Sequence, residues 1–209
     1  MKILFLGYED SPLIDFIQEE DTVWATSQRV ATPDVIAWAP DFIVSYGYKY
    51  ILKAPLLEHY PDRVINLHIS YLPWNRGYHP NFWSFLDNTP RGVSIHFIDE
   101  GIDTGDLLAQ KEVTFGPEED TLEKTYGRLR VEMENLFRES WPAIRSQALP
   151  DHREEAGSAV CTQRQGRAQA RGGGAGLHTG CGWSWGAPEA RSAALARVLT
   201  NSAVLCRLT

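Results

Sequence analysis

The sequence predicts an α/β domain with a largely parallel, twisted β-sheet flanked by helices. Short segments rich in β-branched and aromatic residues alternate with helical segments up to about residue 150, a pattern typical of strands joined by crossover helices. The composition, 43% hydrophobic and 22% charged, is ordinary for a globular protein, and 209 residues suffice for one domain with a smaller appendage. We therefore expect one sizeable core, formed by the residues before 150.

Six strands and four short helices are predicted before residue 120. The chain begins with the apolar run Ile3–Leu6, which indicates a buried first strand. The expected strands are Lys2–Gly7, Asp21–Ser27, Asp41–Gly47, Arg63–Ile69, Gly92–Ile98 and Asp106–Phe115. The expected short helices lie between them at Ser11–Glu19, Pro33–Ala39, Ala54–His59 and Asn81–Leu86.

A longer helix is predicted from Asp120 or Thr121 to about Arg145. Glu123 follows Asp120 by three residues, which predicts a capping box at its start. One stripe of the helix is apolar and should face the core, because its hydrophobic residues recur at spacings of three and four. These residues are Leu122, Tyr126, Leu129, Met133, Leu136, Phe137 and Trp141.

Composition divides the chain into a domain over residues 1–150 and an atypical segment over 151–209. Residues 1–155 contain 26 acidic and 14 basic side chains, whereas 156–209 contain 1 acidic and 6 basic ones together with abundant Gly, Ala and Ser. The later segment is interpreted either as a flexible basic arm or as a disordered, possibly frame-shifted stretch that builds no core, and the second interpretation is favoured. The acidic domain predicts that nucleic acid is not the partner, because phosphate contacts need Lys and Arg.

Membrane insertion and secretion are not predicted. No apolar run approaches the roughly 20 residues that span a bilayer, and Ile3–Leu6 is followed at once by Glu9 and Asp10, unlike a signal sequence. The three cysteines, Cys161, Cys181 and Cys206, have no zinc-site spacing and form an odd number for a disulfide framework. A cytoplasmic protein without a structural metal is therefore expected.

Polar residues that carry chemistry cluster in the segments Val64–Phe85 and Gly92–Asp106. Side chains alternate along a strand, so Asn66 and His68 should share one face near a strand end, where ligands bind in open α/β sheets. The turn-rich loop after the next strand can return a carboxylate to the same edge, and Asp103 is the best candidate.

An amide, an imidazole and a carboxylate at one point suit acyl transfer to an amine without a metal. The amide of Asn66 can donate to the oxyanion that forms at the carbonyl carbon. The imidazole of His68 can take a proton from the attacking amine and relay it to the leaving nitrogen. A carboxylate such as Asp103 can orient the imidazole and favour its charged form.

Three consecutive motifs resemble those of the folate-dependent formyltransferase family. They are Asn-x-His-x-Ser-x-Leu-Pro followed by Arg-Gly, the strand Gly-Val-Ser-Ile-His, and the loop Asp-x-Gly-Ile-Asp-Thr-Gly-Asp. The resemblance is close over Asp41–Phe115 and covers Met1–Gln147 in outline. It implies a Rossmann-like formyltransferase fold, N10-formyltetrahydrofolate as co-substrate, and Asn66, His68 and Asp103 as catalytic residues. It places the folate pocket, largely through main-chain groups, at Tyr46, Gly47, Tyr48, Tyr50, Ile51, Leu52, Asp99, Gly101 and Ile102.

Within that family, the segment LPWNRG…PNFWSF most resembles sugar nucleotide N-formyltransferases. This implies the amine of a nucleotide-linked aminosugar, such as dTDP-4-amino-4,6-dideoxyglucose, as acceptor, and a role in glycan or lipopolysaccharide biosynthesis. Acceptor contacts are expected from Trp74, Asn75, Arg76, Gly77, His79 and Asn81. Those enzymes continue into a C-terminal segment used for dimerisation, which has no match here, so a homodimer stays open.

Other residues and motifs bear on alternative functions. His96 lies on a strand without a convergent polar set, which predicts a packed or hydrogen-bonded residue. The loop Asp99–Asp106 lacks the residue order of an EF-hand, and the first strand does not open a G-x-G-x-x-G turn. Glycinamide ribonucleotide formyltransferase, methionyl-tRNA formyltransferase and an impaired folate- or nucleotide-binding remnant remain as alternative functions.

Overall fold

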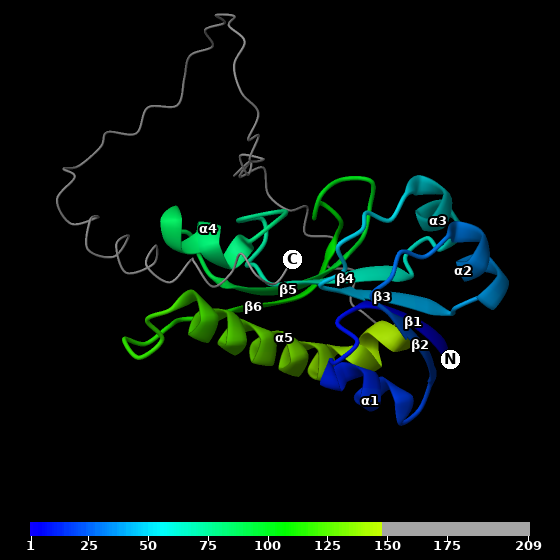
Figure 1. Ribbon diagram of the computed structural model, residues 1–209, viewed down its shortest axis with the longest axis horizontal. Coiled ribbons are helices and arrows are strands. Elements are labelled where there is room, and N and C mark those ends of the chain that lie inside the picture. The colour runs from blue at the N-terminus through cyan, green and yellow to red at the C-terminus, as the bar shows by residue number, and fades with distance from the viewer. Residues whose placement is uncertain (148–209) are drawn as a thin grey trace, which may run out of the picture. The chain divides into compact units, whose positions relative to one another are not determined.

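The computed structural model describes residues 1–147, and the predicted segment 151–209 lies outside the described residues. Six strands form one sheet in the order β2-β1-β3-β4-β5-β6, which confirms the predicted α/β class (Figure 1). The strands are β1 Lys2–Gly7, β2 Thr22–Thr26, β3 Phe42–Tyr46, β4 Val64–His68, β5 Gly92–Phe97 and β6 Leu107–Glu112. The helices are α1 Pro12–Gln18, α2 Thr32–Trp38, α3 Ala54–His59, α4 Pro80–Leu86 and α5 Leu122–Arg145.

The sheet is parallel in its first four strands and antiparallel in its last two. Strand β1 pairs in parallel with β2 and β3, and β3 pairs in parallel with β4. Strand β5 runs antiparallel to β4, and its register places His96 directly opposite Asn66. This change of direction brings polar residues from both strands to the same part of the sheet.

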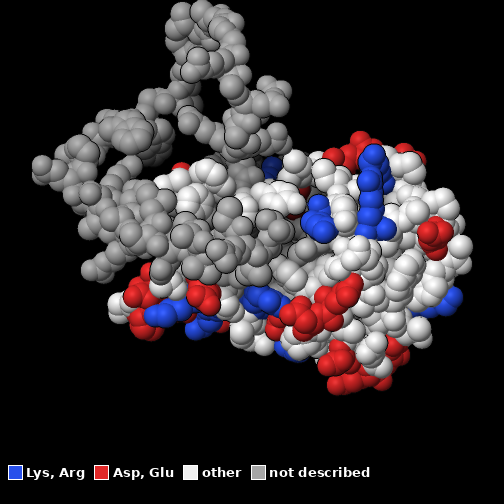
Figure 2. All heavy atoms as spheres, in the orientation of Figure 1, with Lys and Arg blue, Asp and Glu red and all other residues white. Residues whose placement is uncertain are grey.

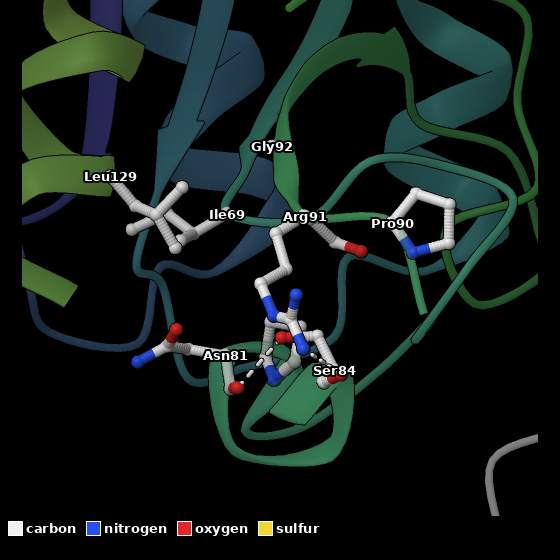
Figure 3. Close-up of a pocket in the computed structure, with 9 residues that line it drawn as sticks. Ile69, Asn81, Ser84, Pro90, Arg91, Gly92 and Leu129 are labelled. Atoms are coloured by element: carbon white, nitrogen blue, oxygen red, sulfur yellow. Dashed lines mark hydrogen bonds between the residues drawn. The ribbon is translucent and has the colours of Figure 1, made fainter. Parts of the chain in front are cut away.

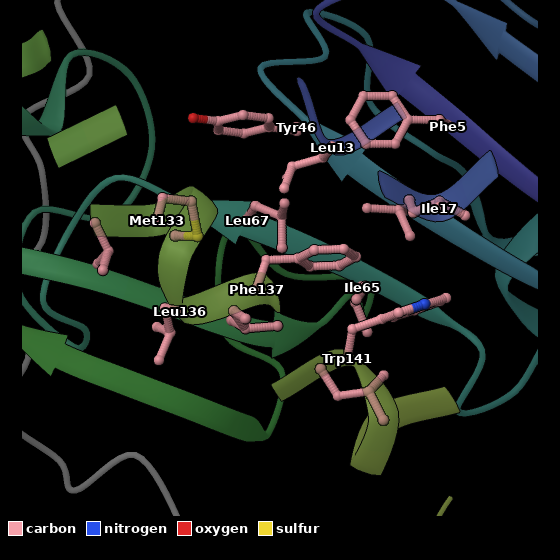
Figure 4. Packing of buried hydrophobic residues seen from close by; sticks show 14 of the residues in the cluster. Phe5, Leu13, Ile17, Tyr46, Ile65, Leu67, Met133, Leu136, Phe137 and Trp141 are labelled. Atoms are coloured by element: carbon pink, nitrogen blue, oxygen red, sulfur yellow. The ribbon is translucent and has the colours of Figure 1, made fainter. Parts of the chain in front are cut away.

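Two hydrophobic clusters cover the two faces of the sheet. On one face, α1 and α5 pack over the strands, and the Trp141 ring lies 5.6 Å from the ring of Phe42. The Trp141 ring also stacks on the ring of Phe137 at 5.1 Å (Figure 4). On the other face, Val35 of α2 and Leu56 of α3 contact the remaining strand residues. The apolar stripe predicted for the long helix therefore faces the core as expected.

The start of α5 agrees with the second of the two predicted positions, Thr121. Thr121, not Asp120, is the N-cap, and its Oγ1 accepts a hydrogen bond from the main-chain N–H of Lys124 at 3.2 Å. Asp120 instead pairs through its carboxylate with the Lys124 Nζ at 2.8 Å. The predicted capping box between Asp120 and Glu123 was wrong. Asp120 and Thr121 are both suitable N-cap residues, and the Thr121 hydroxyl occupies the N-cap position. Within residues 1–147, no helix is long and apolar enough to cross a bilayer.

Candidate active site

Strand β4 presents two different faces, as its alternating sequence predicts. Ile65 and Leu67 point into the core beneath α1 and α5. Asn66 and His68 point to the opposite face, where His68 is buried and Asn66 is half-buried at the carboxyl end of the strand. The apolar residues thus fix the rotation of the strand, and that rotation aims an amide and an imidazole at one place.

The loop after β5 returns Asp103 to this place. Asp103 has a positive φ of 51°, and Gly105 packs so closely on the Phe97 carbonyl that an added Cβ would lie 2.0 Å from its oxygen. The Asp103 carboxylate accepts hydrogen bonds from the Gly77 N–H at 2.7 Å and from Asn66 Nδ2 at 3.2 Å. Its Oδ2 lies 3.6 Å from His68 Nε2. The three predicted catalytic side chains therefore meet.

The surroundings set opposite charge states for His68 and Asp103. Burial lowers the pKa of His68, and the attraction of Asp103 does not overcome this effect. Burial alone would raise the pKa of Asp103, but the neighbouring imidazoles and the Gly77 N–H outweigh it and hold that pKa well below its ordinary value. Near neutral pH the site therefore combines a neutral imidazole with an ionised carboxylate, the arrangement that a proton acceptor requires.

His96 is a fourth member of this polar cluster, contrary to the expectation that it lacks polar neighbours. It is buried and makes hydrogen bonds, which agrees with the other half of that prediction. Its Nδ1 lies 2.7 Å from the Phe97 carbonyl oxygen and its Nε2 lies 3.3 Å from Asn66 Nδ2 and 3.4 Å from Asp103 Oδ1. Because the Phe97 carbonyl can only accept, Nδ1 carries a hydrogen, and Nε2 faces both the Asn66 amide and the Asp103 carboxylate. The antiparallel register between β4 and β5 is the signal that could have identified it.

The residues after β4 divide into buried supports and accessible groups. Asn75 is 2% exposed, donates from Nδ2 to Thr89 Oγ1 at 2.6 Å, and offers its main-chain oxygen to His68 Nε2 at 3.4 Å. Trp74 and Arg76 are half-buried, Gly77 binds Asp103, and His79 is exposed. The Asn75 side chain therefore supports the fold, whereas the side chains of Trp74, Arg76 and His79 are at least partly exposed.

Asn81 joins two helices, contrary to its expected acceptor contact. From α4 its Nδ2 donates to the Leu122 carbonyl at 3.2 Å and to Thr125 Oγ1 at 3.1 Å, and its Oδ1 accepts from the same hydroxyl. Both amide hydrogens are used in these bonds, so none is left for an acceptor. Sequence reasoning missed this role because both partners lie on α5.

In the predicted folate segment after β3, some side chains pack into the fold, and the prediction that its main-chain groups contact folate stays a prediction. The Tyr46 side chain is fully buried beneath α1 and α5 with Tyr8 at 5.0 Å, so it cannot line a surface pocket. Gly47 is exposed, has a φ of 69°, and an added Cβ would lie 2.3 Å from the Tyr8 ring, so only glycine fits there. The Tyr48 hydroxyl donates to the Gln28 carbonyl at 3.0 Å.

The two predicted folate segments each carry an exposed apolar side chain. Ile51 is 81% exposed and Ile102 is 50% exposed. Leu52 instead packs against the hydrophobic cluster beneath α2 and α3. Tyr50 is half-buried, with its ring 5.3 Å from the ring of Tyr48. In the loop after β5, the Asp99 carboxylate accepts bonds from the Gly101 N–H at 3.0 Å and from the Thr104 hydroxyl at 2.6 Å, which fixes the turn.

A separate hollow lies beneath α4 and is not this site (Figure 3). Arg91 reaches into it, donates to the Ser84 carbonyl at 3.1 Å and lies 4.1 Å over the ring of Phe85. None of the catalytic candidates lines it. The lining residues are Ile69, Ser70, Pro80, Asn81, Ser84, Pro90, Arg91, Gly92 and Leu129.

The mostly parallel sheet with an amide, an imidazole and a carboxylate at the end of β4 defines a transferase of the acyl-transfer class. Residues 12–140 match the family described as formyl transferase, so the chain belongs to this family. The formyltransferase PseJ from Anoxybacillus kamchatkensis, solved with UDP-4,6-dideoxy-4-formamido-L-AltNAc and tetrahydrofolate, is 48% identical with a TM-score of 0.68. That match covers 72% of this chain and 79% of PseJ.

Two other relatives represent the alternative acceptors. A phosphoribosylglycinamide formyltransferase structure from Bacillus halodurans is 27% identical with a TM-score of 0.56, and the match covers 71% of this chain and 82% of that one. A methionyl-tRNA formyltransferase of Geobacter metallireducens is 33% identical over 140 residues, which cover 57% of this chain. The chain spans 45% of the length of that relative.

Proposed function

We propose that this protein transfers a formyl group from N10-formyltetrahydrofolate to the amine of a nucleotide-linked aminosugar. The observation that carries the proposal is the meeting of Asn66, His68 and Asp103 at the end of β4. The 48% identity to PseJ, solved with a formamido sugar nucleotide and tetrahydrofolate, supports the same choice of substrates.

His68 is assigned the proton transfers. In the reaction the acceptor nitrogen forms a bond to the formyl carbon, and the bond from that carbon to N10 of the folate breaks. One proton must leave the attacking amine and one must reach the departing nitrogen, so the protons balance if one base relays them. The lowered pKa of His68 keeps its imidazole neutral and ready to accept the first proton.

Asn66 is assigned the stabilisation of negative charge on the formyl oxygen. Its two amide hydrogens face Asp103 at 3.2 Å and His96 at 3.3 Å, at or just beyond the long end of the usual hydrogen-bond range. An oxyanion can replace one of these long bonds at modest cost, because the amide is already oriented. Asp103 then stabilises the charged form that His68 takes during the reaction, and His96 helps to position the amide.

The exposed surface around the cluster fits a folate. Ile51, after β3, and Ile102, after β5, offer exposed apolar contact area. The Asp99 carboxylate holds the loop Asp99–Asp103 in shape by accepting hydrogen bonds from the Gly101 N–H and the Thr104 hydroxyl, so the main-chain groups of the loop are fixed before any ligand binds. Flat ring systems with a polar edge bind well to such combinations of apolar side chains and main-chain groups.

The acceptor is proposed to be a 4-amino-4,6-dideoxysugar. The sequence motif favours a dTDP-linked sugar such as dTDP-4-amino-4,6-dideoxyglucose, whereas PseJ holds a UDP-linked sugar formylated at the same position. Both carry a nitrogen at carbon 4, as the amine in one and the formamide in the other, and both lack the hydroxyl at carbon 6. Methionyl-tRNA is a second candidate acceptor, favoured by the 33% identity to the Geobacter metallireducens enzyme, but the acidic domain provides little attraction for tRNA.

One assay tests the proposal. The purified full chain is incubated with N10-formyltetrahydrofolate and one acceptor at a time, and both tetrahydrofolate release and the mass of the acceptor are measured. The acceptors are UDP- and dTDP-linked 4-amino-4,6-dideoxysugars, glycinamide ribonucleotide and methionyl-tRNA. Formylation of a sugar nucleotide is expected, and formylation of only glycinamide ribonucleotide or methionyl-tRNA would overturn the proposal.

A further inference from the structure

Ser94 and Gln110 lie in one row of the sheet with His68, and neither takes part in the proposed mechanism. Ser94 of β5 stands directly opposite His68 of β4, and Gln110 of β6 stands directly opposite Ser94. Residues that face each other across neighbouring strands project from the same side of a sheet, so all three side chains lie on the catalytic face. Ser94 is fully buried and Gln110 is half-buried.

These two side chains hold the start of the loop after β4. Ser94 Oγ donates to the Ser70 carbonyl at 2.7 Å and accepts from the Leu72 N–H at 3.1 Å. Gln110 Nε2 donates to the same hydroxyl at 2.9 Å and to the Leu72 carbonyl at 2.7 Å. The one hydrogen and both lone pairs of the hydroxyl are therefore used. Ser70 Oγ in turn donates to the Trp74 carbonyl, which extends the restraint along the loop.

The same loop carries two main-chain groups that contact the catalytic cluster. The Asn75 carbonyl oxygen lies 3.4 Å from His68 Nε2. The Gly77 N–H donates to Asp103 Oδ2 at 2.7 Å. Because both are main-chain groups, their positions depend on the path of the loop and not on the side chains of Asn75 and Gly77.

We infer that Ser94 and Gln110 are positioning residues for formyl transfer, because they hold the loop after β4 with its main-chain groups against His68 and Asp103. The inference rests on the proposed function, in which His68 moves the protons. Without these two side chains the start of the loop loses its hydrogen bonds to β5 and β6. The Asn75 carbonyl and the Gly77 N–H would then move away from the groups that they orient.

Displacement of the loop should also change the charge balance of His68. Burial lowers the pKa of His68, and the Asn75 carbonyl opposes this effect because it can only accept a hydrogen bond, which favours the protonated imidazole. The charged and titratable groups that face His68 are Asp103, His96 and Arg76. Arg76 lies on the same loop and lowers the pKa, but a hydrogen bond weakens with small displacements more steeply than the effect of a charge. A displaced loop should therefore lower the pKa of His68 further.

The test replaces Gln110 by leucine in the full chain and measures three quantities. They are kcat for formyl transfer, the Kd for tetrahydrofolate by calorimetry, and the pKa of His68 by NMR of isotope-labelled histidines, with the signal assigned from His68→Gln. We expect kcat to fall by about 10- to 10²-fold, the scale on which a small misplacement caused by a distant mutation acts. The pKa of His68 should fall, and the Kd for tetrahydrofolate should stay nearly unchanged.

The matched control is Glu132→Gln, which weakens a contact of β6 that does not involve the loop. Glu132 pairs with Lys111 of β6 at 2.6 Å and with Arg128 at 2.7 Å. Figure 2 shows acidic and basic side chains close together along α5, where these pairs belong. Glu132→Gln should lower Tm without changing kcat or the pKa of His68.

The two variants decide the inference. An unchanged kcat or an unchanged pKa of His68 in Gln110→Leu would overturn it, and so would equal changes in Glu132→Gln, because lower stability alone would then explain them. Ser94→Ala removes three hydrogen bonds and should act in the same direction at least as strongly, and if it does not fold, Gln110→Leu still decides. If the wild-type chain formylates no acceptor, the proposed function fails, whereas a lowered pKa of His68 in Gln110→Leu would still support the positioning by the loop.

Discussion

Replacing Asp103 by asparagine should reduce turnover by about 10³. The carboxylate lies 3.6 Å from His68 Nε2, and at an effective dielectric constant of about 20 a charge at that distance stabilises the protonated imidazole by about 4–5 kcal/mol. At 1.36 kcal/mol per factor of ten, this corresponds to about three powers of ten in rate. The value falls within the range of about 10²–10⁴ expected when positioned acid-base help is lost.

The substitution keeps the shape of the side chain but disturbs its bonds. The asparagine oxygen can still accept from the Gly77 N–H, which turns the new amide nitrogen toward Asn66 Nδ2, another donor. Folate affinity should change little, because the exposed apolar contacts at Ile51 and Ile102 are untouched. The loss should therefore appear in kcat rather than in KM for the folate.

The assay is the rate of tetrahydrofolate release with saturating acceptor, compared with that of Asp106→Asn. Asp106 is an exposed carboxylate three residues further along the same loop, so its variant removes the same charge outside the cluster. A kcat for Asp103→Asn within tenfold of the wild-type value would refute the reasoning, as would an equal loss in the Asp106 variant.

The same carboxylate predicts a dependence of stability on pH. The folded-state pKa of Asp103 is lowered, so the stabilisation by its ionised form is present in full above about pH 4 and is lost as the pH falls through the folded-state value. The difference in Tm between wild type and Asp103→Asn should therefore narrow below about pH 4. A difference that stays constant from pH 7 to pH 3 would contradict an ionised Asp103 in the folded state.

Three other variants test separate parts of the site. Because burial lowers the pKa of His68, kcat/KM should fall on the acid side only well below pH 6.5. The variant His68→Ala should lose about 10²–10⁴ in kcat. If the pH profile of kcat/KM is unchanged in that variant, His68 is not the base. Asn66→Ala should lose about 10²–10³ in kcat if its amide stabilises the oxyanion, and a near-normal rate would remove that role. Asn81→Ala removes the hydrogen bonds that Asn81 makes to the buried Thr125 hydroxyl and to the Leu122 carbonyl, and it should cost about 2 kcal/mol, or roughly 4–8 °C in Tm, with folate affinity unchanged. A large rise in the acceptor KM without loss of Tm would support the predicted contact between Asn81 and the acceptor.

Local patterns in the sequence determined much of this protein. Alternation along β4 was enough to place Asn66 and His68 on one face, because apolar Ile65 and Leu67 must point into the core. The three- and four-residue spacing of apolar side chains likewise predicted which stripe of α5 is buried. These features depend only on the helical or strand period, which neighbouring residues specify without reference to distant ones.

The tertiary structure alone decided which distant residues meet. The register of the antiparallel pair β4 and β5 places His96 in the catalytic cluster. Asn81 of α4 forms hydrogen bonds to α5, and the Tyr46 ring packs against Tyr8 in the core. Arg29 and Lys49, which are 20 residues apart in the sequence, both approach the ring of Tyr50. The hydrogen bond from the Tyr48 hydroxyl to the Gln28 carbonyl joins their two loops. Such contacts follow from strand order and helix packing, which are set by the burial of the whole core, so no local stretch of sequence contains them.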